Sequence, residues 1–356
     1  MEAVTLRVSL ERTRRPLSTS AENAHVHWSA REHLMLRVED SNGSVGLGEC
    51  SPLPSFSPDT LSGCEAALRE LDLGALSERV DVSELHSELA RASELIGQQF
   101  PAARCALETA LLDLWSRALG IPAWQAIAAL PKPGSPRSIA GLLANLDTGV
   151  EDMRDALEGG LRTFKFKIGR SGAFARELAI LRELRAVCPA HGRLRIDANR
   201  ALDRAAIAQL TSFELEWLEE PCAPDALPTL ADLALPLALD ESLCGLSPTQ
   251  AEALWDHTPN LRAIVLKPML LGVSACLELA RRAKLRGLAV VLSHTFDDRV
   301  ALGVSATLAL GVGSRDVAHG LDLAGARFAG PPPLGFARAT LEPWDQPGLA
   351  VSCERP

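Results

Sequence analysis

Hydrophobic and polar positions alternate with a period of two in residues 163–169, Thr-Phe-Lys-Phe-Lys-Ile-Gly. Such alternation predicts a β-strand whose successive side chains point to opposite faces. The two phenylalanines and the isoleucine form an apolar face, while Lys165 and Lys167 share the other. We expect the apolar face to pack beneath helices, so both ammonium groups point together into another part of the molecule.

From about residue 135 onward, short apolar runs alternate with segments that are mostly long enough for one helix each. The eight runs are RSIAGLLAN, TFKFKIG, RLRIDAN, LEWLEEP, LPLALDES, AIVLKP, AVVLSH and VAHGLDL. Alternating strands and helices imply a parallel sheet, and eight units predict a closed, TIM-like (β/α)8 barrel. An open doubly wound sheet is the alternative, but its Gly-rich phosphate turn does not occur in this sequence.

The first third of the chain mixes strand-like and helical patterns, which is typical of an α+β domain. Apolar residues at helical spacing predict a long helix over residues 100–120, closed by Gly120 and Pro122. Residues 48–60, GECSPLPSFSPDT, are rich in proline and serine and therefore predict a long loop. A loop of this length in a compact domain is often functional.

These patterns predict three parts: an α+β domain over residues 1–120, a barrel over 121–324 and a C-terminal segment over 325–356. The last segment, rich in proline and glycine, is expected to pack back on the first domain. A loosely ordered terminus is the alternative interpretation of the same composition.

Composition excludes several classes of protein. The chain is 47% hydrophobic and 23% charged, with a net charge of −9 and no long basic run, which argues against binding nucleic acid. No apolar stretch approaches the ~20 residues of a membrane span, and the N-terminus lacks the apolar core of a signal peptide. The eight scattered cysteines form no CxxC pair, so we expect reduced thiols in a cytoplasmic protein.

Charged residues end five of the apolar runs, where a barrel carries its chemistry. The second run ends in the lysine pair at 165 and 167, and the sixth ends in Lys267. Between them, Asp197, Glu219 and Asp240 are 22 and 21 residues apart, close to one strand–helix unit each. Each acid alone is typical of a cap or turn, but together they predict three carboxylates at one level of the barrel.

Three converging carboxylates repel one another unless a cation lies between them. Oxygen donors without histidine or cysteine favour Mg²⁺ over zinc, and Mn²⁺ could substitute. Lysines on both sides then suit proton abstraction next to a carboxylate: one lysine takes the proton, and the metal and the other lysine stabilise the enediolate. Two ammonium groups about 7 Å apart repel by about 2 kcal/mol at an effective dielectric of about 20, so Lys165 lowers the pKa of Lys167, while the carboxylates raise it.

Other polar residues near the run ends are candidates for binding or support. Arg195 faces the same side as Asp197 and could hold a substrate carboxylate or pair with an acid, and Asn199 could support the metal ligands. Ser293 could bind a substrate carboxylate, while His294 is a rival acid or base and equally suits a cap or turn. The weakest candidates, both near the eighth run, are His319 and Asp322.

The order Lys-x-Lys, Asp, Glu, Asp, Lys resembles the enolase superfamily, muconate-lactonizing-enzyme subgroup, in which a lysine base with Mg²⁺ is a known pairing. Within it, GECSPLPSFSPDT, ALETALLDLW, RIDANRA, LEEPC, LDES and LKP are similar to the o-succinylbenzoate synthase family of menaquinone biosynthesis. The resemblance implies a (β/α)7β barrel with an α+β capping domain that the C-terminal tail completes. It also implies Mg²⁺ on the three acids, Lys167 as base and then acid, and Lys267 as enolate stabiliser.

The reaction so implied is dehydration of a small dicarboxylate, 2-succinyl-6-hydroxy-2,4-cyclohexadiene-1-carboxylate, to o-succinylbenzoate. Ser55 and Phe56 of the loop join Arg195 and Ser293 as expected substrate contacts. The seventh run departs from the Ser/Gly-rich end common in that family, because it ends in Ser-His-Thr, and the chain has no tyrosine.

Three alternatives stay open. An N-acylamino acid racemase or dipeptide epimerase of the same superfamily would use both lysines as bases on opposite faces. A Schiff-base aldolase could use Lys267 but leaves the carboxylates unexplained, and a non-enzymatic ligand-binding barrel leaves the whole set unexplained. The sequence does not fix the oligomeric state.

Overall fold

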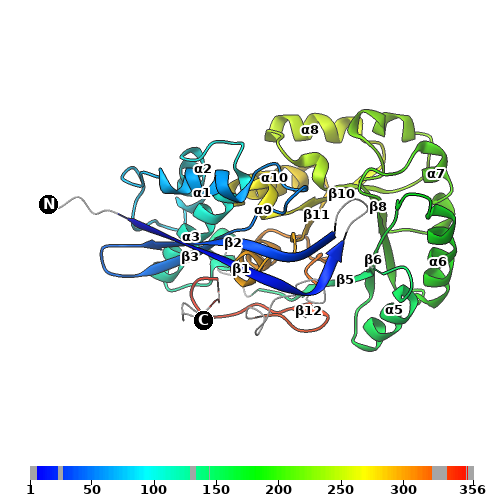
Figure 1. Ribbon diagram of the computed structural model, residues 1–356, viewed down its shortest axis with the longest axis horizontal. Coiled ribbons are helices and arrows are strands. Elements are labelled where there is room, and N and C mark those ends of the chain that lie inside the picture. The colour runs from blue at the N-terminus through cyan, green and yellow to red at the C-terminus, as the bar shows by residue number, and fades with distance from the viewer. Residues whose placement is uncertain are drawn as a thin grey trace.

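The structure is a computed structural model that describes residues 6–22, 27–128, 134–143, 145–322, 335–349 and 351. Two sheets organise these residues, an antiparallel one near the N-terminus and a curled parallel one beyond it. In Figure 1 the blue hairpin and the cyan helices lie on one side of the molecule, and the parallel sheet with its green helices lies on the other.

The first domain is a three-stranded antiparallel sheet in the order β1-β2-β3, covered by helices. Apolar residues at alternate positions of the middle strand, Leu34, Leu36 and Val38, are fully buried, as the period of two requires. Its elements are β1 (Arg7–Glu22), β2 (His27–Glu39), β3 (Val45–Cys50), α1 (Leu61–Arg69), α2 (Leu85–Glu94), α3 (Pro101–Leu119) and α4 (Ala123–Ala128).

Helix α3 confirms the long helix predicted over residues 100–120. A proline occupies its first turn, and it ends at Gly120, whose φ of 70° is left-handed. Almost every residue of α3 as far as Ser116 is buried. The physical reason is that α3 lies against β3 on one side and against α2, α9 and α10 on others.

Two glycines of β3 allow α3 to lie directly on the strand. A Cβ atom on Gly46 would stand 1.9 Å from the carbonyl oxygen of Ala110, and one on Gly48 would stand 1.9 Å from that of Ala106. Both obstacles are helix backbone, which cannot move aside as a flexible side chain can. The contact between strand and helix therefore requires glycine at both positions.

The parallel sheet follows the order β11-β10-β9-β8-β7-β6-β5, so neighbours in sequence are neighbours in space. Its strands are β5 (Ala140–Leu143), β6 (Thr163–Lys167), β7 (Arg193–Asp197), β8 (Trp217–Glu219), β9 (Leu237–Leu239), β10 (Leu261–Leu266) and β11 (Ala289–Leu292). The eighth predicted run forms no full strand, but single parallel bridges join His319 to Ile139 and Gly320 to Ser293. This segment therefore lies between β11 and β5 and closes the barrel, which confirms the predicted fold.

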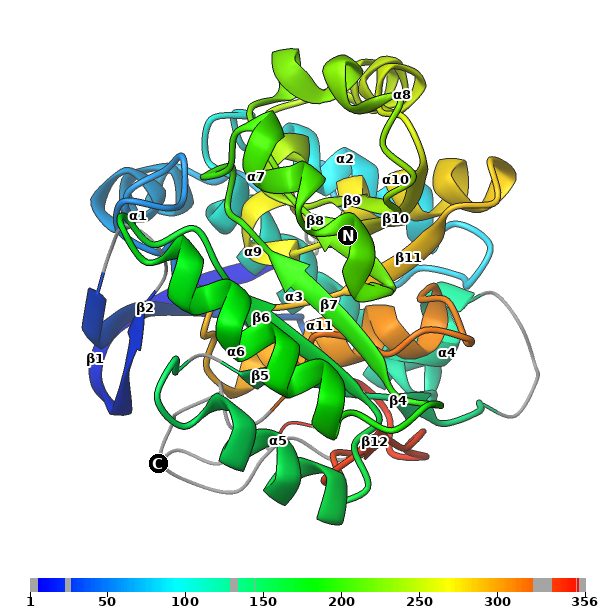
Figure 2. The same cartoon turned by 90° about the vertical axis from the view of Figure 1, so that its right-hand side faces the viewer.

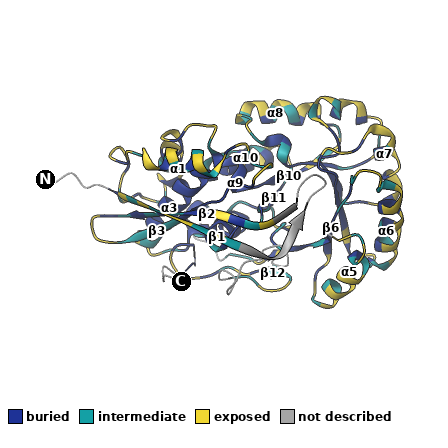
Figure 3. Ribbon diagram, viewed as in Figure 1, coloured by how far each residue is buried: buried dark blue, intermediate teal, exposed yellow. Residues whose placement is uncertain are grey.

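Helices and short 3-10 turns cover the outside of the sheet (Figure 2). The helices are α5 (Gly149–Glu158), α6 (Phe174–Val187), α7 (Arg204–Ala208), α8 (Pro248–His257), α9 (Pro268–Leu271), α10 (Val273–Leu285) and α11 (Arg299–Gly311), and the turns are Thr211–Phe213, Pro224–Leu230 and Glu241–Leu243. Figure 3 shows exposed residues on the outer sides of α5 to α8. Helices α9, α10 and α11 instead face the first domain.

Part of the C-terminal segment returns to α3 and α4. A short strand β12 (Thr340–Leu341) pairs with β4 (Arg137–Ser138), and the Trp124 indole donates to the Trp344 carbonyl at 2.9 Å. The Leu349 amide donates to Asp113 at 2.9 Å. Residues 323–334 lie outside the described residues, and the three domain boundaries stay predictions.

Glu49 joins the first domain to the barrel. This buried carboxylate accepts hydrogen bonds from the His33 ring and the Ser51 hydroxyl, both at 2.9 Å, and from the Asp298 and Ala301 amides, both at 3.0 Å. Burial raises its pKa, but the His33 hydrogen bond and charge and the two amides outweigh burial and lower it to about 2.

Seven of the eight cysteines fall within the described residues, and all seven are free thiols. Cys353 lies outside them. No helix in the described part of the chain is both long enough and apolar enough to cross a membrane.

We predict that Gly48→Ala destabilises the fold, because its methyl group would collide with the backbone of α3. The free energy of unfolding should fall by about 1–3 kcal/mol or more, as in other overpacked cores. Chemical denaturation measures this change. The control is Gly149→Ala, where a Cβ would meet only Phe166 at 3.8 Å; an equal effect of both substitutions would contradict the prediction.

Glu49 should make stability depend on acid pH. Its folded-state pKa lies below its ordinary value of 4.5, so its contribution is complete above about pH 4.5 and is lost as the pH falls toward 2. The loss should be on the order of 3 kcal/mol, because folding lowers the pKa of Glu49 from 4.5 to about 2. Unfolding curves of the wild type and Glu49→Gln should differ most near neutral pH and converge in acid, whereas a constant gap would disprove the assignment.

Candidate active site

The carboxyl ends of the barrel strands bring the predicted charged residues together. The strand register places Lys167 of β6 beside Asp197 of β7, and Asp197 beside Glu219 of β8. Asp240 directly follows β9, and Lys267 directly follows β10. All three acids are buried, with at most 2% of their surface exposed. The three carboxylates therefore converge at one end of the barrel, as the sequence predicts.

The three lysines engage the carboxylates unequally. Lys165 donates to Glu219 and lies 2.9 Å from Asp197 Oδ2. Lys267 donates to Asp240. Among the described residues, Lys167 has one such contact, with 3.9 Å between its Nζ and Asp197 Oδ2. Of the three ammonium groups, Lys167 is therefore the least strongly held.

The electrostatic environment separates the pKa values of the lysines in the same order. Burial lowers the pKa of Lys167, and repulsion from Lys165 and Lys267 adds to burial, so that the attraction of Asp197 is outweighed. Burial also acts on Lys165 and Lys267, but their directly paired carboxylates raise both pKa values above normal. Lys167 is thus the lysine best suited to exchange a proton near neutral pH.

The three carboxylates compete for this positive charge. Burial, together with repulsion from Asp197 and Asp240, raises the pKa of Glu219 to about 7, although Lys165 opposes the rise. Burial also raises the pKa of Asp240. Asp197 behaves differently, because Lys165, Lys167 and Lys267 overcome burial and lower its pKa. The three lysines therefore do not fully offset the cost of burying three negatively charged carboxylates.

A divalent cation would suit this cluster. Among the described residues, no three histidine, cysteine, aspartate or glutamate side chains already lie together as a metal site, and lysine ammonium groups contact all three acids. Asp197 Oδ2 is a buried atom that lies 2.9 Å from the Lys165 ammonium group and 3.9 Å from that of Lys167, so it already interacts with positive charge. Because all the donors are carboxylate oxygens, Asp197, Glu219 and Asp240 fit Mg²⁺, and their role as ligands stays a prediction.

The second glutamate of the Glu219-Glu220 pair supports the site from behind. Glu220 is fully buried and accepts hydrogen bonds from the Asp240 amide at 2.7 Å, the Ser242 amide at 2.9 Å and the Ser242 hydroxyl at 2.6 Å. Arg200 donates to it at 2.9 Å. Glu220 thereby ties the end of β8 to the turn that carries Asp240. Sequence reasoning missed this role, for which Ser242, two residues beyond Asp240, was a weak signal.

Asn199 holds a neighbouring turn. Its amide N–H donates to Asp197 Oδ1 at 3.0 Å, and its side chain donates to Glu241 at 3.2 Å. Asn199 also has a left-handed φ of 41°, which asparagine tolerates better than most residues. The expected supporting role of Asn199 therefore has a geometric basis.

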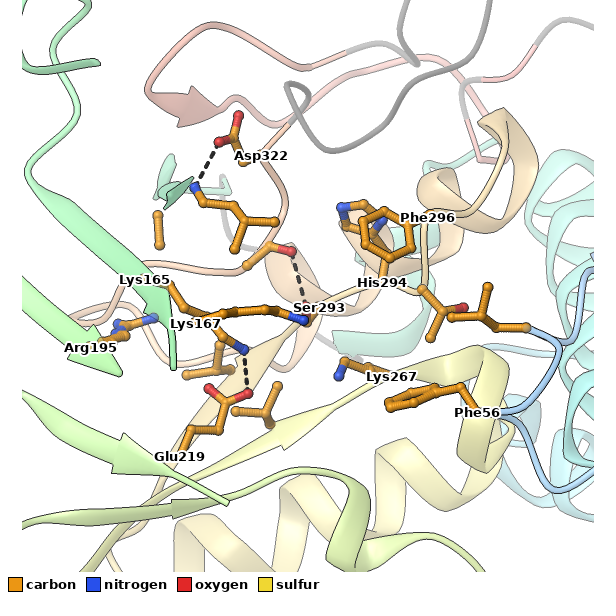
Figure 4. Close-up of a pocket in the computed structure, with 17 residues that line it drawn as sticks. Phe56, Lys165, Lys167, Arg195, Glu219, Lys267, Ser293, His294, Phe296 and Asp322 are labelled. Carbon is orange, nitrogen blue, oxygen red and sulfur yellow. Dashed lines mark hydrogen bonds and ion pairs between the residues drawn. The ribbon is translucent and has the colours of Figure 1, made fainter. Parts of the chain in front are cut away.

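Above these groups lies an open pocket. Figure 4 shows Lys165 and Lys167 entering it from one side and Lys267 from another, with His294 and Phe296 on the far side. Apolar and polar residues share its lining: Leu53, Phe56, Ala140, Leu142, Lys165, Lys167, Arg195, Glu219, Val265, Lys267, Val291, Ser293, His294, Thr295, Phe296, Gly320 and Asp322. A mostly apolar wall with a few convergent charges is typical of a small-molecule site.

The pocket includes most of the predicted substrate contacts. Arg195 is almost fully buried, stacks 3.9 Å from the Trp217 ring centre and donates to Glu216 at 2.6 Å and to the Ala318 carbonyl at 2.8 Å. Its Nη2 is buried without a partner among the described residues. Arg195 thus pairs with an acid, which is one of its two predicted roles, and its contact with a substrate carboxylate stays a prediction.

The remaining candidates divide between the pocket and the scaffold. Phe56 lines the pocket with its ring centre 5.3 Å from Lys267 Nζ, whereas Ser55 is exposed and does not line it. Ser293 also lines the pocket, and its hydroxyl donates to the Gly320 carbonyl at 3.2 Å. His319 is structural, since it is buried, accepts from the Leu292 amide at 3.0 Å and has its pKa lowered to about 3 by burial.

Two weaker candidates also lie at the pocket. Asp322 accepts a hydrogen bond from the Leu142 amide at 2.9 Å. His294 has a lowered pKa, chiefly because burial disfavours the imidazolium form. His294 is therefore held in its neutral form.

Comparison with known proteins identifies two family models along the chain. Residues 149–355 match the "Enolase C-terminal domain-like" model. Residues 2–128 match the "Mandelate racemase / muconate lactonizing enzyme, N-terminal domain" model.

Relatives with different activities are similar to this chain at nearly the same level. An o-succinylbenzoate synthase from Thermosynechococcus vestitus is 29% identical over 80% of this chain and 83% of its own. An N-succinylamino acid racemase from Thermus thermophilus is 30% identical over 65% of this chain and 62% of its own. A solved dipeptide epimerase from Methylococcus capsulatus, complexed with Mg and a dipeptide, has a TM-score of 0.81 at 24% identity, covering 98% and 99% of the two chains.

We predict that Mg²⁺ stabilises the folded protein through the three acids. At a concentration 100 times its Kd, a ligand of the folded state adds about 2.7 kcal/mol to the free energy of unfolding. Asp240→Asn should lose most of this gain in thermal unfolding measured with and without MgCl₂. The control is Asp147→Asn, an exposed acid paired with Arg176, and an unchanged Mg²⁺ effect in Asp240→Asn would remove Asp240 from the ligand set.

Proposed function

Since the chain belongs to the enolase superfamily, we propose that it is an Mg²⁺-dependent o-succinylbenzoate synthase. The proposed reaction removes water from 2-succinyl-6-hydroxy-2,4-cyclohexadiene-1-carboxylate. One observation supports the proposal: Lys167 and Lys267 line one pocket together with Glu219, and both contact the buried carboxylates of Asp197 and Asp240 beside it. An aldolase or a simple binding protein would not need this combination.

Each charged group has a proposed task. Mg²⁺, when bound by Asp197, Glu219 and Asp240, supplies positive charge that acidifies the carbon next to the substrate carboxylate. Lys167 removes the proton from that carbon, which its lowered pKa favours. Lys267, cationic beside Asp240, stabilises the negative charge that develops.

Lys167 then completes the dehydration. The proton that it has taken is delivered to the 6-hydroxyl group as the carbon–oxygen bond breaks, so one water leaves and the ring becomes aromatic. The same lysine serves as base and acid, and no oxidant or other reactant is needed. The positive charge of Lys165 helps to lower the pKa of Lys167. Lys165 also forms ion pairs with Asp197 and Glu219.

The proposal extends to substrate contacts and setting. Phe56, Ser293 and the free Nη2 of Arg195 would contact the succinyl part of a dicarboxylate, while Ser55 is too far out in the structure to support its predicted contact. Mn²⁺ would substitute for Mg²⁺. The expected setting is menaquinone biosynthesis in the cytoplasm, the pathway to which the sequence resemblance points.

A second function is favoured by the same lysine geometry. In an N-acylamino acid racemase or dipeptide epimerase, Lys167 and Lys267 would act as bases on opposite faces of the substrate. The similar identity of the racemase relative supports this alternative. The raised pKa of Lys267 disfavours it, because a base must be free of its proton.

The ultraviolet change on mixing purified protein with the cyclohexadiene carboxylate tests the first function. We expect rapid dehydration with Mg²⁺, none with EDTA, and a fall of at least about 10²-fold in Lys167→Ala, as for other lost acid–base groups. Lys284→Ala serves as control, because this exposed lysine lies outside the pocket.

No dehydration by folded, Mg²⁺-loaded protein would reject the synthase. Deuterium exchange at the α-carbon of N-succinyl amino acids and dipeptides would then be measured. Exchange lost in both Lys167→Ala and Lys267→Ala would establish the alternative.

A further inference from the structure

Two loops from different parts of the chain form the outer wall of the pocket. The capping loop, residues 51–57, contributes Leu53 and Phe56, and the β11 loop, residues 293–298, contributes His294 and Phe296. Figure 4 shows Phe56 and Phe296 on different sides of the space above the lysines. The separation between these loops therefore determines which substrate fits.

Both loops contain a residue in a strained backbone conformation. Ser55 in the capping loop has φ 64°, and Phe296 in the β11 loop has φ 56°. For an L-residue other than glycine, this left-handed conformation costs on the order of 1 kcal/mol or more. Such conformations persist only where surrounding contacts hold them, so each loop needs an anchor.

Arg31 of β2 contacts both loops. Its guanidinium donates to the Ser51 carbonyl and, at 3.3 Å, to the Pro52 carbonyl at the start of the capping loop. The same guanidinium lies 3.9 Å from Asp297 Oδ1 in the β11 loop. The side chains of both charged residues are only 1% exposed, so their charges attract each other with little screening by water.

Asp297 in turn contacts Thr295, which lines the pocket. Its Oδ1 accepts a hydrogen bond from the Thr295 hydroxyl at 2.6 Å, between the two pocket residues His294 and Phe296. Asp297 Oδ2 and Arg31 Nε are both buried without a hydrogen-bond partner among the described residues. The pair is thus close but not fully formed, and a small approach of the loops would complete it.

We propose that Arg31 is a positioning residue for substrate binding, which joins the capping loop to the β11 loop and sets the width of the pocket between them. The proposal rests on the proposed function only for its assay. Arg31 itself does not line the pocket, so it acts through the two loops and not on the reacting atoms.

Glu49 does not make Arg31 redundant. Glu49 binds the Asp298 and Ala301 amides, and thereby fixes the start of α11. Arg31 is the residue that reaches the segment between His294 and Asp297. Because the lysines and acids of the site lie on strands β6 to β10, loosening the two loops should weaken substrate binding and leave the chemical step largely unchanged.

Arg31→Met and Asp297→Asn test the proposal from opposite ends of the contact. We expect KM to rise about tenfold in each, with kcat within about threefold of the wild type, the pattern of lost uniform binding. The KM of Arg31→Lys should lie between those of the wild type and Arg31→Met, because lysine keeps the charge but not the forked arrangement of donors. The control is Arg37→Met, on the same strand but with its side chain 43% exposed and 3.9 Å from Glu39, which should leave KM unchanged.

The double variant Arg31→Met/Asp297→Asn distinguishes a joint role from two separate ones. If one bridge carries both effects, KM in the double variant should match the larger single effect and not the product. Thermal unfolding is recorded for each variant, and Asp297→Asn, which keeps the side-chain shape, carries the test if Arg31→Met does not fold.

A purely structural role predicts lowered melting temperatures with unchanged KM, and this result would overturn the proposal. If the wild-type protein does not dehydrate the cyclohexadiene carboxylate, the proposed function is wrong, but the positioning role of Arg31 can still be tested. The same variants are then compared on whichever N-succinyl amino acid or dipeptide exchanges its α-proton.

Discussion

Positive charge supplied to three buried carboxylates is the constraint on which the site depends. Asp197, Glu219 and Asp240 lie together on neighbouring strand ends, where isolated ionised acids would be strongly disfavoured. Lys165 and Lys267 satisfy part of this demand by direct contact. Lys167 is left between their positive charges and a single distant acid oxygen. The lowered pKa of Lys167 is therefore a property of the whole cluster.

Holding these charges in place requires support from residues that never touch the pocket. Glu220, equally buried, accepts four hydrogen bonds and fixes the turn beyond β9 to the end of β8. Glu49 likewise fastens the capping domain to the start of α11. Neither acid acts on a substrate, yet each sets where other groups lie.

The sequence predicted the barrel and the strand-end charges because both follow from local periodicity and regular spacing. Lys165, Lys167 and Lys267 could be placed from the ends of their runs alone. The sequence could not predict that Glu220, next to the predicted ligand Glu219, would accept hydrogen bonds from the turn beyond β9. Contacts between distant segments, such as Arg31 with Asp297, leave no periodic signal. The net direction of the Lys167 pKa also required the three-dimensional sum of opposing charges.

Helix α3 has a consequence for how the molecule is built. Because it is buried on nearly all sides, between β3 and the helices α9 and α10, a single apolar cluster continues from the first sheet into the barrel. The two domains are therefore distinct in topology but share one core. Neither half, cut from the other, would retain a closed apolar interior, so we expect the two domains to unfold together. Variation among such enzymes is then easiest in the loops, which lie outside that shared core.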